Sequence, residues 1–261
     1  MTRLQPTLHR HPIAGFGAKQ SPKPLVSIII ATFNAVDTLP VTLRSVAEQT
    51  YANRELVIVD GGSTDGTLDV IQRSGGPSGS WSSETDHGIY DAFNKGIERS
   101  SGDWIYFLGA GDRFVDGDVL ERVFSIPRQG KMLYGDVLLP RSQRRYGGRF
   151  SKLNLGLRNI CQQSIFYAKE LFDRIGPFEM QYRVWADWAF NLQCFADPCT
   201  KPEYLHSVIA VYDEDGFSSS RVDAEFARNA KELIRPLGRL PWCAYQLKQF
   251  ARSAVGKRPI A

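Results

Sequence analysis

LVSIIIA at residues 25–31 and ELVIVD at residues 55–60 are the two stretches that decide the fold of this chain. Both are short, rich in β-branched residues and without a regular polar alternation, which is typical of strands buried on both faces. Between them, apolar residues recur at helical spacing from Leu39 to Ala47. This order predicts a βαβ unit, and therefore an α/β fold with a Rossmann-like, mostly parallel central sheet flanked by helices.

The same rhythm continues towards the C-terminus. A Gly/Ser/Pro loop at 75–80 interrupts it once, and after the third strand it becomes less regular. The elements that we predict beyond Asp60 are a short helix at 67–73, a helix at 88–99, a buried strand at 104–108, strands at 132–139 and 159–167, and a helix at 186–195.

The composition is that of a folded chain. Of its 261 residues, 43% are hydrophobic and 23% are charged, and 15 Phe and 10 Tyr supply apolar surface for a sizeable core. No apolar run approaches the roughly 20 residues of a membrane-spanning helix. Met1–Pro24 lacks the apolar centre of a secretory signal peptide, so we expect a cytoplasmic location. The four cysteines show no spacing typical of a zinc site.

The chain divides into three parts. Residues 1–23 mix Pro, His, Gly and basic residues without periodicity and are expected to form a flexible leader. Residues 24–220 are expected to form the α/β domain. Residues 221–261 contain nine Lys and Arg against three Asp and Glu, and are predicted to form basic amphipathic helices broken by Pro236 and Pro241.

The basic C-terminal segment has two interpretations. Leucines and aromatic residues among arginines and lysines suit a helix that lies in a membrane interface, where cations meet anionic lipid. They suit equally a helix that docks on the domain and leaves its basic face in solvent. A basic segment on a nearly neutral body favours an anionic partner surface. We expect peripheral contact with an anionic membrane and no nucleic-acid partner.

Polar residues follow each predicted strand of the first half. Thr32 and Asn34 come after the first strand, Asp60 ends the second, Asp112 follows the third, and Asp86 lies in the loop between the second and third. In an open parallel sheet these positions converge at the carboxyl edge, where ligands bind. Three carboxylates at one edge repel each other unless a cation lies among them, which favours a divalent cation with a diphosphate ligand. Taken singly, each is also an ordinary turn or cap residue.

Pro24–Asp112 resembles the N-terminal half of glycosyltransferase family 2 enzymes, which have the GT-A fold. The matching motifs, in chain order, are VSIIIATFN (26–34), EQT (48–50), ELVIVDGGSTDGT (55–67) and FLGAGD (107–112). SETDHGIYDAFNKGI (83–97) resembles a subgroup that builds bacterial surface polysaccharides. The second half matches more loosely, through YGD (134–136), CQQS (161–164) and ADW (186–188). The resemblance implies that residues 24–220 are a GT-A glycosyltransferase domain.

The resemblance also implies roles for the residues at the strand ends. Asp60 corresponds to a residue that meets the uracil ring, Thr32 and Asn34 approach the nucleotide, and Asp86 lies near the base or the ribose. Asp112 corresponds to the last acid of the metal-binding DxD motif, although the motif here reads Ala-Gly-Asp. Mg²⁺ or Mn²⁺ would bridge this carboxylate and the diphosphate of the donor.

Residues of the second half receive roles in the same way. Asp187 corresponds to the acid that serves these enzymes as general base, so that a single displacement inverts the anomeric centre. Lys95 is a candidate diphosphate contact whose ordinary interpretation is a solvated helix face. Gln162 and Gln163 stand where the subgroup has His-Gln, and they are candidate substrate contacts by hydrogen bonding. Trp188 is either a stacking platform for the acceptor sugar or a core residue.

The predicted function is inverting transfer of a sugar from a nucleotide-diphosphate sugar, with UDP implied, to a glycan or lipid-linked saccharide acceptor. The pathway is surface glycan synthesis of the exopolysaccharide, O-antigen or capsule type, at the inner face of the plasma membrane. One alternative is a degenerate, non-catalytic protein that binds nucleotide sugar or a partner. The other is a sugar nucleotidyltransferase, which typically has a Gly-rich basic loop where this chain has Thr32-Phe33-Asn34.

Overall fold

The computed structural model describes residues 23–74, 80–214 and 223–254. The leader predicted at residues 1–23 lies outside this range except for Lys23. Within the described part, nine strands form one sheet with the order β3-β2-β1-β4-β8-β6-β9-β5, and β7 pairs with β6. The strands are β1 Val26–Thr32, β2 Arg54–Asp60, β3 Ser80–Ser83, β4 Trp104–Gly109, β5 Arg113–Phe114, β6 Met132–Leu139, β7 Arg144–Tyr146, β8 Ile165–Ala168 and β9 Glu203–Val211.

The sheet has a parallel half and a mixed half. β3, β2, β1 and β4 are parallel to one another, as predicted for the first part of the chain. β8 is antiparallel to both β4 and β6, so β6 again points the same way as β1. β9 runs parallel to β6 with an irregular register, and β5 closes the sheet by pairing antiparallel with β9.

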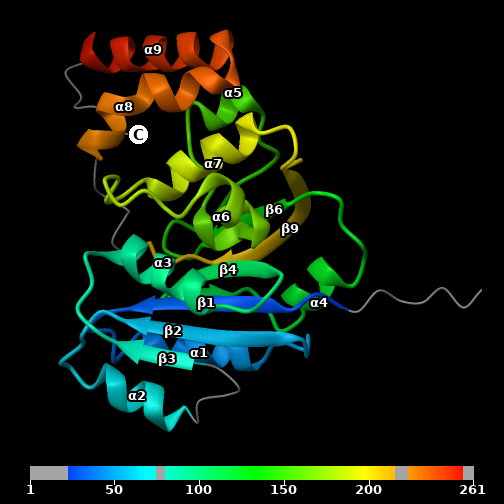
Figure 1. Cartoon of the computed structure of the whole chain (residues 1–261), viewed down its shortest axis with the longest axis vertical. Helices are drawn as coiled ribbons and strands as arrows, with labels where there is room; N and C mark the ends of the chain where they lie inside the picture. The colour runs from blue at the N-terminus through cyan, green and yellow to red at the C-terminus, as the bar shows by residue number, and fades with distance from the viewer. Residues whose placement is uncertain (1–22, 75–79, 215–222, 255–261) are drawn as a thin grey trace, which may run out of the picture.

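Helices cover both faces of the sheet, and Figure 1 shows α3 in front of the parallel strands with α1 behind them. α8 and α9 lie at the top of this view, above α7. The helices are α1 Leu39–Ala47, α2 Thr67–Arg73, α3 Ile89–Arg99, α4 Val119–Phe124, α5 Lys152–Leu155, α6 Glu170–Ile175, α7 Ala186–Ala196, α8 Ala224–Ile234 and α9 Arg239–Ala254, with short 3-10 helices η1 Gln162–Ser164 and η2 Arg235–Leu237.

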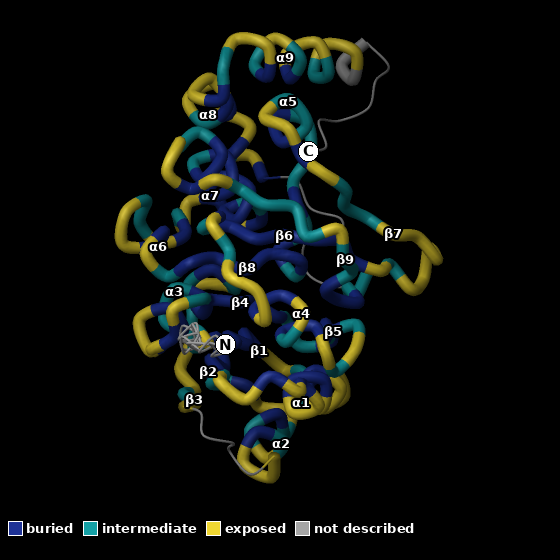
Figure 2. Tube along the Cα trace, turned by 90° about the vertical axis from the view of Figure 1, so that its right-hand side faces the viewer, coloured by how far each residue is buried: buried dark blue, intermediate teal, exposed yellow. Residues whose placement is uncertain are grey.

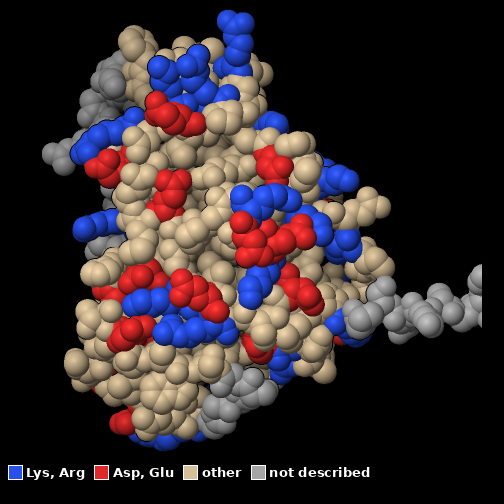
Figure 3. Space-filling view, in the orientation of Figure 1, with Lys and Arg blue, Asp and Glu red and all other residues tan. Residues whose placement is uncertain are grey.

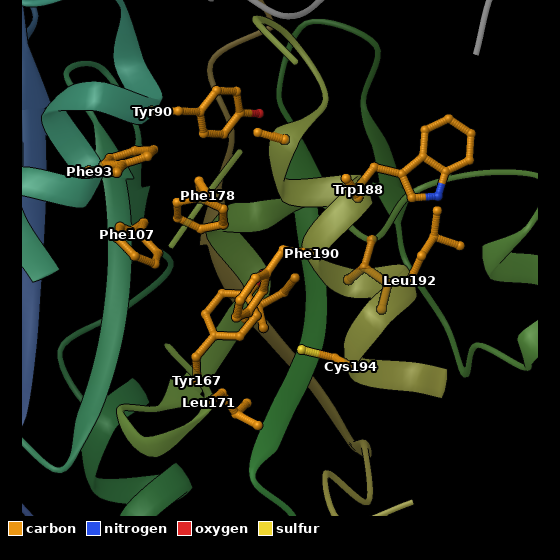
Figure 4. Packing of buried hydrophobic residues seen from close by; sticks show 14 of the residues in the cluster. Tyr90, Phe93, Phe107, Tyr167, Leu171, Phe178, Trp188, Phe190, Leu192 and Cys194 are labelled. Atoms are coloured by element: carbon orange, nitrogen blue, oxygen red, sulfur yellow. The ribbon is translucent and has the colours of Figure 1, made fainter. Parts of the chain in front are cut away.

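Two hydrophobic cores follow from the alternation of side chains along the strands. Ile29 and Phe107 point to one face, where they pack with α3, α6, α7 and α8. Ile28 and Leu108 point to the other face, where they pack with α1, α2 and α4. Figure 4 shows the first core from close by, with aromatic side chains from α3, β4 and α7 in contact. Burial on both faces explains why these strands read as unbroken apolar runs.

Three expectations about the elements are corrected. Residues 159–167 do not form one strand: Gln162–Ser164 is a 3-10 helix, and the strand begins only at Ile165. Part of the expected loop at 75–80 belongs to a strand, because β3 begins at Ser80. Pro241 does not break the C-terminal helices; it lies in the first turn of α9, where its missing N–H leaves no intrahelical bond unmade.

The C-terminal segment is helical, as predicted, and part of it docks on the domain. Phe226 of α8 is fully buried and stacks on Trp188 of α7, with ring centroids 4.6 Å apart. Tyr245 of α9 is buried in the same core. Figure 2 shows that α9 buries its inner face and exposes its outer face. Across the described ranges, none of the helices combines the length and the apolar character that crossing a bilayer requires.

Candidate functional site

The strand ends of the parallel half lie side by side at one edge of the sheet. Thr32 at the end of β1 pairs in register with Asp60, and Asp60 pairs with Ser83 at the end of β3. On the other side, Ala31 pairs with Gly109, from which the chain continues to Asp112. The structure thus confirms the prediction that these polar residues lie at one edge of the sheet.

Asp60 holds the turn that follows β2. It is fully buried, and its Oδ2 accepts hydrogen bonds from the backbone N–H groups of Gly62 and Ser63, at 3.0 and 2.9 Å, and from the hydroxyl of Ser83 at 2.6 Å. The Ser63 hydroxyl donates to its Oδ1. Both carboxylate oxygens therefore hold this turn in place, and the uracil contact implied by the resemblance stays a prediction.

Asn34 joins the loop after β1 to the same turn. Its N–H donates to the Ser63 hydroxyl at 2.7 Å, and its side-chain oxygen accepts from the N–H of Thr64 at 2.9 Å. The backbone at Asn34 has φ of +46°, a conformation that Asn tolerates better than most residues. Its side chain is therefore used to fix the two loops together.

Phe33 is a residue that the sequence interpretation passed over. It is 62% exposed at the carboxyl edge, and its ring edge would lie 3.3 Å from a Cβ built on Gly61. The same Cβ would lie 2.7 Å from Oδ2 of Asp86. A Cβ at position 61 would collide with these two side chains, so only glycine allows Phe33 and Asp86 to lie this close to the backbone. An aromatic residue between two polar ones directly after a buried strand was the signal available in the sequence.

Asp86 and Thr32 complete this part of the edge. Asp86 is half-buried, and its Oδ1 accepts from the N–H of Gly88 at 2.9 Å, just before α3. The Thr32 hydroxyl is buried and has no hydrogen-bond partner within the described ranges. A buried hydroxyl without a protein partner needs one from water or from a ligand, and Thr32 stays a candidate nucleotide contact.

Lys95 lies on α3 among carboxylates. Its Nζ is 3.3 Å from Asp91 and 3.6 Å from Glu84, and it also approaches the carbonyl of Thr85 at 3.5 Å. The ammonium group is thus neutralised by acids of its own neighbourhood. The structure gives no support to Lys95 as a diphosphate contact beyond its proximity to the Asp86 loop.

Asp112 is the buried carboxylate at the end of the β4 loop. Oδ2 accepts from Nε2 of Gln163 at 2.8 Å and from the N–H of Gly109 at 3.2 Å, and Oδ1 accepts from the N–H of Asp213 at 2.8 Å. Burial raises the pKa of Asp112 to about 7, although these hydrogen bonds oppose the shift. Such a carboxylate gains much from a cation beside it.

A second carboxylate lies near Asp112. A Cβ built on Gly111, whose φ is +107°, would be 2.8 Å from Oδ2 of Asp213. Within the described part of the chain there is no cluster of three or more His, Cys, Asp or Glu side chains suited to a metal ion. Mg²⁺ is usually held by one or two carboxylates together with phosphate oxygens and water. The pair Asp112 and Asp213 fits that donor set, and sequence reasoning missed Asp213.

Helix α1 positions the loop that carries Asp112. The Thr42 hydroxyl donates to the carbonyl of Asp112 at 2.7 Å and accepts from the N–H of Gly111 at 2.9 Å. Just beyond the C-terminal end of α1, Gln49 donates to the carbonyl of Asp116 at 2.7 Å and accepts from the N–H of Leu120 at 3.1 Å. These contacts give the EQT motif at 48–50 a structural role.

The two glutamines of η1 face different neighbours. Gln163 donates to Asp112, and its backbone carbonyl accepts from the hydroxyl of Tyr106 at 2.7 Å. Gln162 is buried, and its Nε2 has no hydrogen-bond partner within the part of the chain that the structure describes. A buried amide donor without a protein partner is satisfied by ordered water or by a bound ligand. Gln162 stays a candidate substrate contact, whereas Gln163 is a partner of Asp112.

Asp187 lies in the first turn of α7 and is 7% exposed. The Tyr90 hydroxyl donates to its Oδ1 at 2.7 Å, and Nδ2 of Asn159 donates to its Oδ2 at 2.6 Å. Burial raises the pKa of Asp187 to about 6, and the two hydrogen bonds oppose part of this shift. A carboxylate with a raised pKa is a stronger base than an exposed one, and it is still ionised at neutral pH.

Comparison with known proteins identifies the family of this chain. Residues 27–178 match the family model described as glycosyl transferase family 2. The chain belongs to glycosyltransferase family 2. A "PGL/p-HBAD biosynthesis glycosyltransferase" of Mycobacterium tuberculosis is 43% identical over 213 residues, which cover 78% of this chain and 83% of that protein. The "putative teichuronic acid biosynthesis glycosyltransferase TuaG" of Bacillus subtilis is 37% identical over 100 residues, which cover 35% of this chain and 38% of that protein.

Solved structures agree on the fold of the transferase. The structure of Staphylococcus aureus TarS 1-349 in complex with UDP-GlcNAc has a TM-score of 0.69 at 17% identity, and covers 88% of this chain and 74% of that one. The mannosyltransferase PcManGT from Pyrobaculum calidifontis, in complex with GDP-Man and Mn²⁺, has a TM-score of 0.61 at 16% identity, with 91% and 77% covered. The predicted GT-A fold is thereby confirmed.

The structure distinguishes between the two interpretations of Trp188 in the transferase. It is 1% exposed, and its Nε1 donates to the carbonyl of Leu155 at 2.8 Å. Figure 4 shows its ring on the far side of α7 from Tyr90, and thus away from Asp187's partner. The structure makes Trp188 a core residue, which corrects its candidacy as a sugar-stacking platform.

Proposed function

We propose that the transferase moves a sugar from a UDP-sugar to a glycan acceptor with inversion at the anomeric carbon. The observation that carries this proposal is the buried Asp187 carboxylate, which is held by two donors and has a raised pKa while Asp112 lies among the carboxyl ends of the strands. Family membership removes the sugar nucleotidyltransferase as an alternative. UDP is favoured because structural neighbours with this fold include complexes with UDP and UDP-GlcNAc.

The donor nucleotide would lie against the ends of β1, β2 and β3. Phe33 offers an exposed aromatic face on which a base can stack, and Asp86 offers an oxygen beside it for an N–H of the base or a hydroxyl of the ribose. The hydroxyl of Thr32 and the amide of Gln162 are buried groups that lack partners in the described residues, and they would pair with donor oxygens. Asp60 and Asn34 keep the loops in place.

The proposed metal site consists of Asp112 and Asp213 together with the diphosphate and water. Bound Mg²⁺ or Mn²⁺ would neutralise the charge that develops on the departing diphosphate. Asp112 would supply a carboxylate oxygen to the cation, and Gln163, which donates to Oδ2 of Asp112, would hold that carboxylate in place.

Asp187 supplies the base for the transfer. As the acceptor oxygen attacks the anomeric carbon, the bond from that carbon to the diphosphate oxygen breaks, and the acceptor proton passes to the carboxylate. One displacement inverts the configuration, so an α-linked donor would give a β-linkage.

We further propose that the acceptor is lipid-linked and that the transferase meets it at the inner face of the plasma membrane. α9 exposes Leu240, Leu247 and Phe250, which are 67%, 69% and 75% exposed. Figure 3 shows Lys and Arg side chains gathered on the surface over α8 and α9. Apolar side chains beside cations fit an anionic lipid surface. Acceptors of the PGL/p-HBAD class, named for the mycobacterial relatives, are the first to assay.

Calorimetric titration with UDP, GDP and dTDP, each with and without Mn²⁺, tests the proposal on wild type and on Asp112→Ala. We expect UDP to bind most tightly, with a requirement for metal that the variant loses. Metal-independent binding that Asp112→Ala leaves unchanged would remove Asp112 from the mechanism. Binding without transfer to any acceptor would favour the degenerate, non-catalytic alternative.

A further inference from the structure

The hydroxyl of Tyr90 lies between two acceptors. It is 2.7 Å from Oδ1 of Asp187 and 2.8 Å from the carbonyl oxygen of Val184. A phenol has one proton, so it donates to only one of these acceptors at a time, and its oxygen can accept a bond in return. Figure 4 shows the Tyr90 side chain extending from α3 with its hydroxyl turned towards the chain that leads into α7. Tyr90 is buried, so water does not replace either bond.

We propose that Tyr90 is a positioning residue that pairs with Asp187 both before and after proton transfer; this rests on the proposed role of Asp187 as general base. Before transfer, the phenol donates to the ionised carboxylate. The acceptor O–H bond then breaks and an O–H bond forms on Asp187. The acid donates from Oδ1 to the phenol oxygen, and the phenol proton turns to the carbonyl of Val184. Both states are satisfied, and only hydrogen atoms move.

Asn159 differs from Tyr90 because its amide nitrogen can only donate, and it donates more strongly to Oδ2 of the ionised carboxylate than to Oδ2 of the acid. Its side-chain oxygen accepts from Nδ2 of Asn191 at 3.0 Å, and the oxygen of Asn191 accepts from the hydroxyl of Tyr167 at 2.8 Å. This chain of bonds fixes the amide with its NH₂ group towards Oδ2 of Asp187. An amide nitrogen donates but does not accept, so a protonated Oδ2 would find no partner there.

The titratable groups that interact with Asp187 stay uncharged at neutral pH, so Asp187 is the group among them that titrates there. The titratable groups that interact with it are Tyr90 from α3, Tyr146 from β7, Tyr167 from β8 and the thiol of Cys161 before η1. Burial raises the pKa of all four, so each is uncharged at neutral pH. Burial raises the pKa of Asp112 to about 7, so the profile is measured at saturating Mn²⁺, which keeps that carboxylate ionised. The acidic limb of the kcat–pH profile then reports Asp187 and its two hydrogen-bond donors.

The test compares kcat–pH profiles of wild type, Tyr90→Phe and Asn159→Ala at saturating UDP-sugar. Asn159→Ala removes a donor that favours the ionised form over the acid, so it should move the acidic limb to higher pH by about one unit and leave the plateau within about threefold. Tyr90→Phe removes a partner of both forms. Its limb should move by less than that of Asn159→Ala, while its plateau should fall roughly tenfold.

Tyr51→Phe is the matched control, because Tyr51 is also a buried tyrosine whose hydroxyl makes one bond, to the carbonyl of Pro24 at 2.6 Å, in the other core. It should change neither limb nor plateau. Melting temperatures and UDP binding of all variants show whether each is folded. If Tyr90→Phe does not fold, 3-fluorotyrosine at position 90, a better donor of the same size, should move the limb to lower pH.

The outcomes distinguish a failure of the role proposed for Tyr90 from a failure of the assignment of Asp187 as the base. Equal limb shifts in Tyr90→Phe and Asn159→Ala with an intact plateau, or no effect of Tyr90→Phe, would overturn the two-state role of Tyr90. Undiminished activity of Asp187→Asn would instead overturn the assignment of the base itself.

Discussion

Phe33 is a single residue on which donor binding should depend. Stacking of an aromatic side chain on a base contributes about 1–3 kcal/mol, so Phe33→Ala should weaken UDP binding by roughly 5- to 150-fold. Since the side chain is 62% exposed, the melting temperature should not fall. Isothermal calorimetry measures the affinity. Ile126→Ala, a change at a residue that is 54% exposed after α4, is the control that should leave UDP binding unchanged. Equal affinity of Phe33→Ala and wild type would place the base elsewhere.

Asp187 is the residue on which turnover should depend. Asp187→Asn keeps the size of the side chain and removes the base, so kcat should fall by about 10²- to 10⁴-fold. UDP binding should stay at the wild-type level, because Asp187 lies on α7 rather than at the ends of β1 to β3. In wild type, a base with a pKa of about 6 is protonated below that pH, so activity should decline as pH falls through 6. A flat profile down to pH 5 would contradict this assignment.

At the scale of elements, α1 and Gln49 just after it hold the segment from Gly109 to Leu120. Gln49→Leu removes hydrogen bonds to Asp116 and Leu120 and leaves a buried N–H unpaired, so the free energy of unfolding should fall by about 1–3 kcal/mol. Metal-dependent UDP binding should weaken with it, because the same loop carries Asp112. Urea unfolding and calorimetry check the two effects. Glu48→Gln, at an exposed neighbour on the same helix end, should change neither.

Helices and strands whose apolar residues form a continuous run or recur at a regular spacing could be predicted from the sequence. The buried strands β1, β2 and β4 and helices α1 and α3 follow from runs and spacings that local sequence displays. β3 was not, because its four residues are mostly exposed and it exists only through pairing with β2. Residues 159–164 were not either, because their polar side chains are turned inward by partners such as Asp112 and Asp187.

At the level of the whole molecule, the proposed membrane contact is the outer face of α9. Replacing Leu240, Leu247 and Phe250 together by Gln should abolish co-sedimentation with anionic phosphatidylglycerol vesicles, while binding to neutral phosphatidylcholine vesicles should be weak for both proteins. The melting temperature should hold, because all three side chains are exposed. Deleting residues 221–261 would be a poor test, since Phe226 and Tyr245 belong to the core.

Ile126→Gln is the matched control for the membrane experiment. It removes an exposed apolar side chain after α4 and should leave vesicle binding at the wild-type level. Added salt should weaken the binding of wild type, because charged contacts with lipid headgroups are screened. Equal sedimentation of wild type and the triple variant would show that α9 is not the contact surface.

The family, the parallel half of the sheet and the edge where Thr32, Asp60 and Asp112 lie could all be predicted from the amino-acid sequence. Local apolar patterns and strand ends carry that information along the chain. Tertiary structure alone decided how the side chains are used. It buried Asp60 as a loop holder and Trp188 as core, and brought Asp213 next to Asp112 from 101 positions away. Hydrogen-bond partners and burial depend on residues distant in sequence, so no local pattern could reveal them.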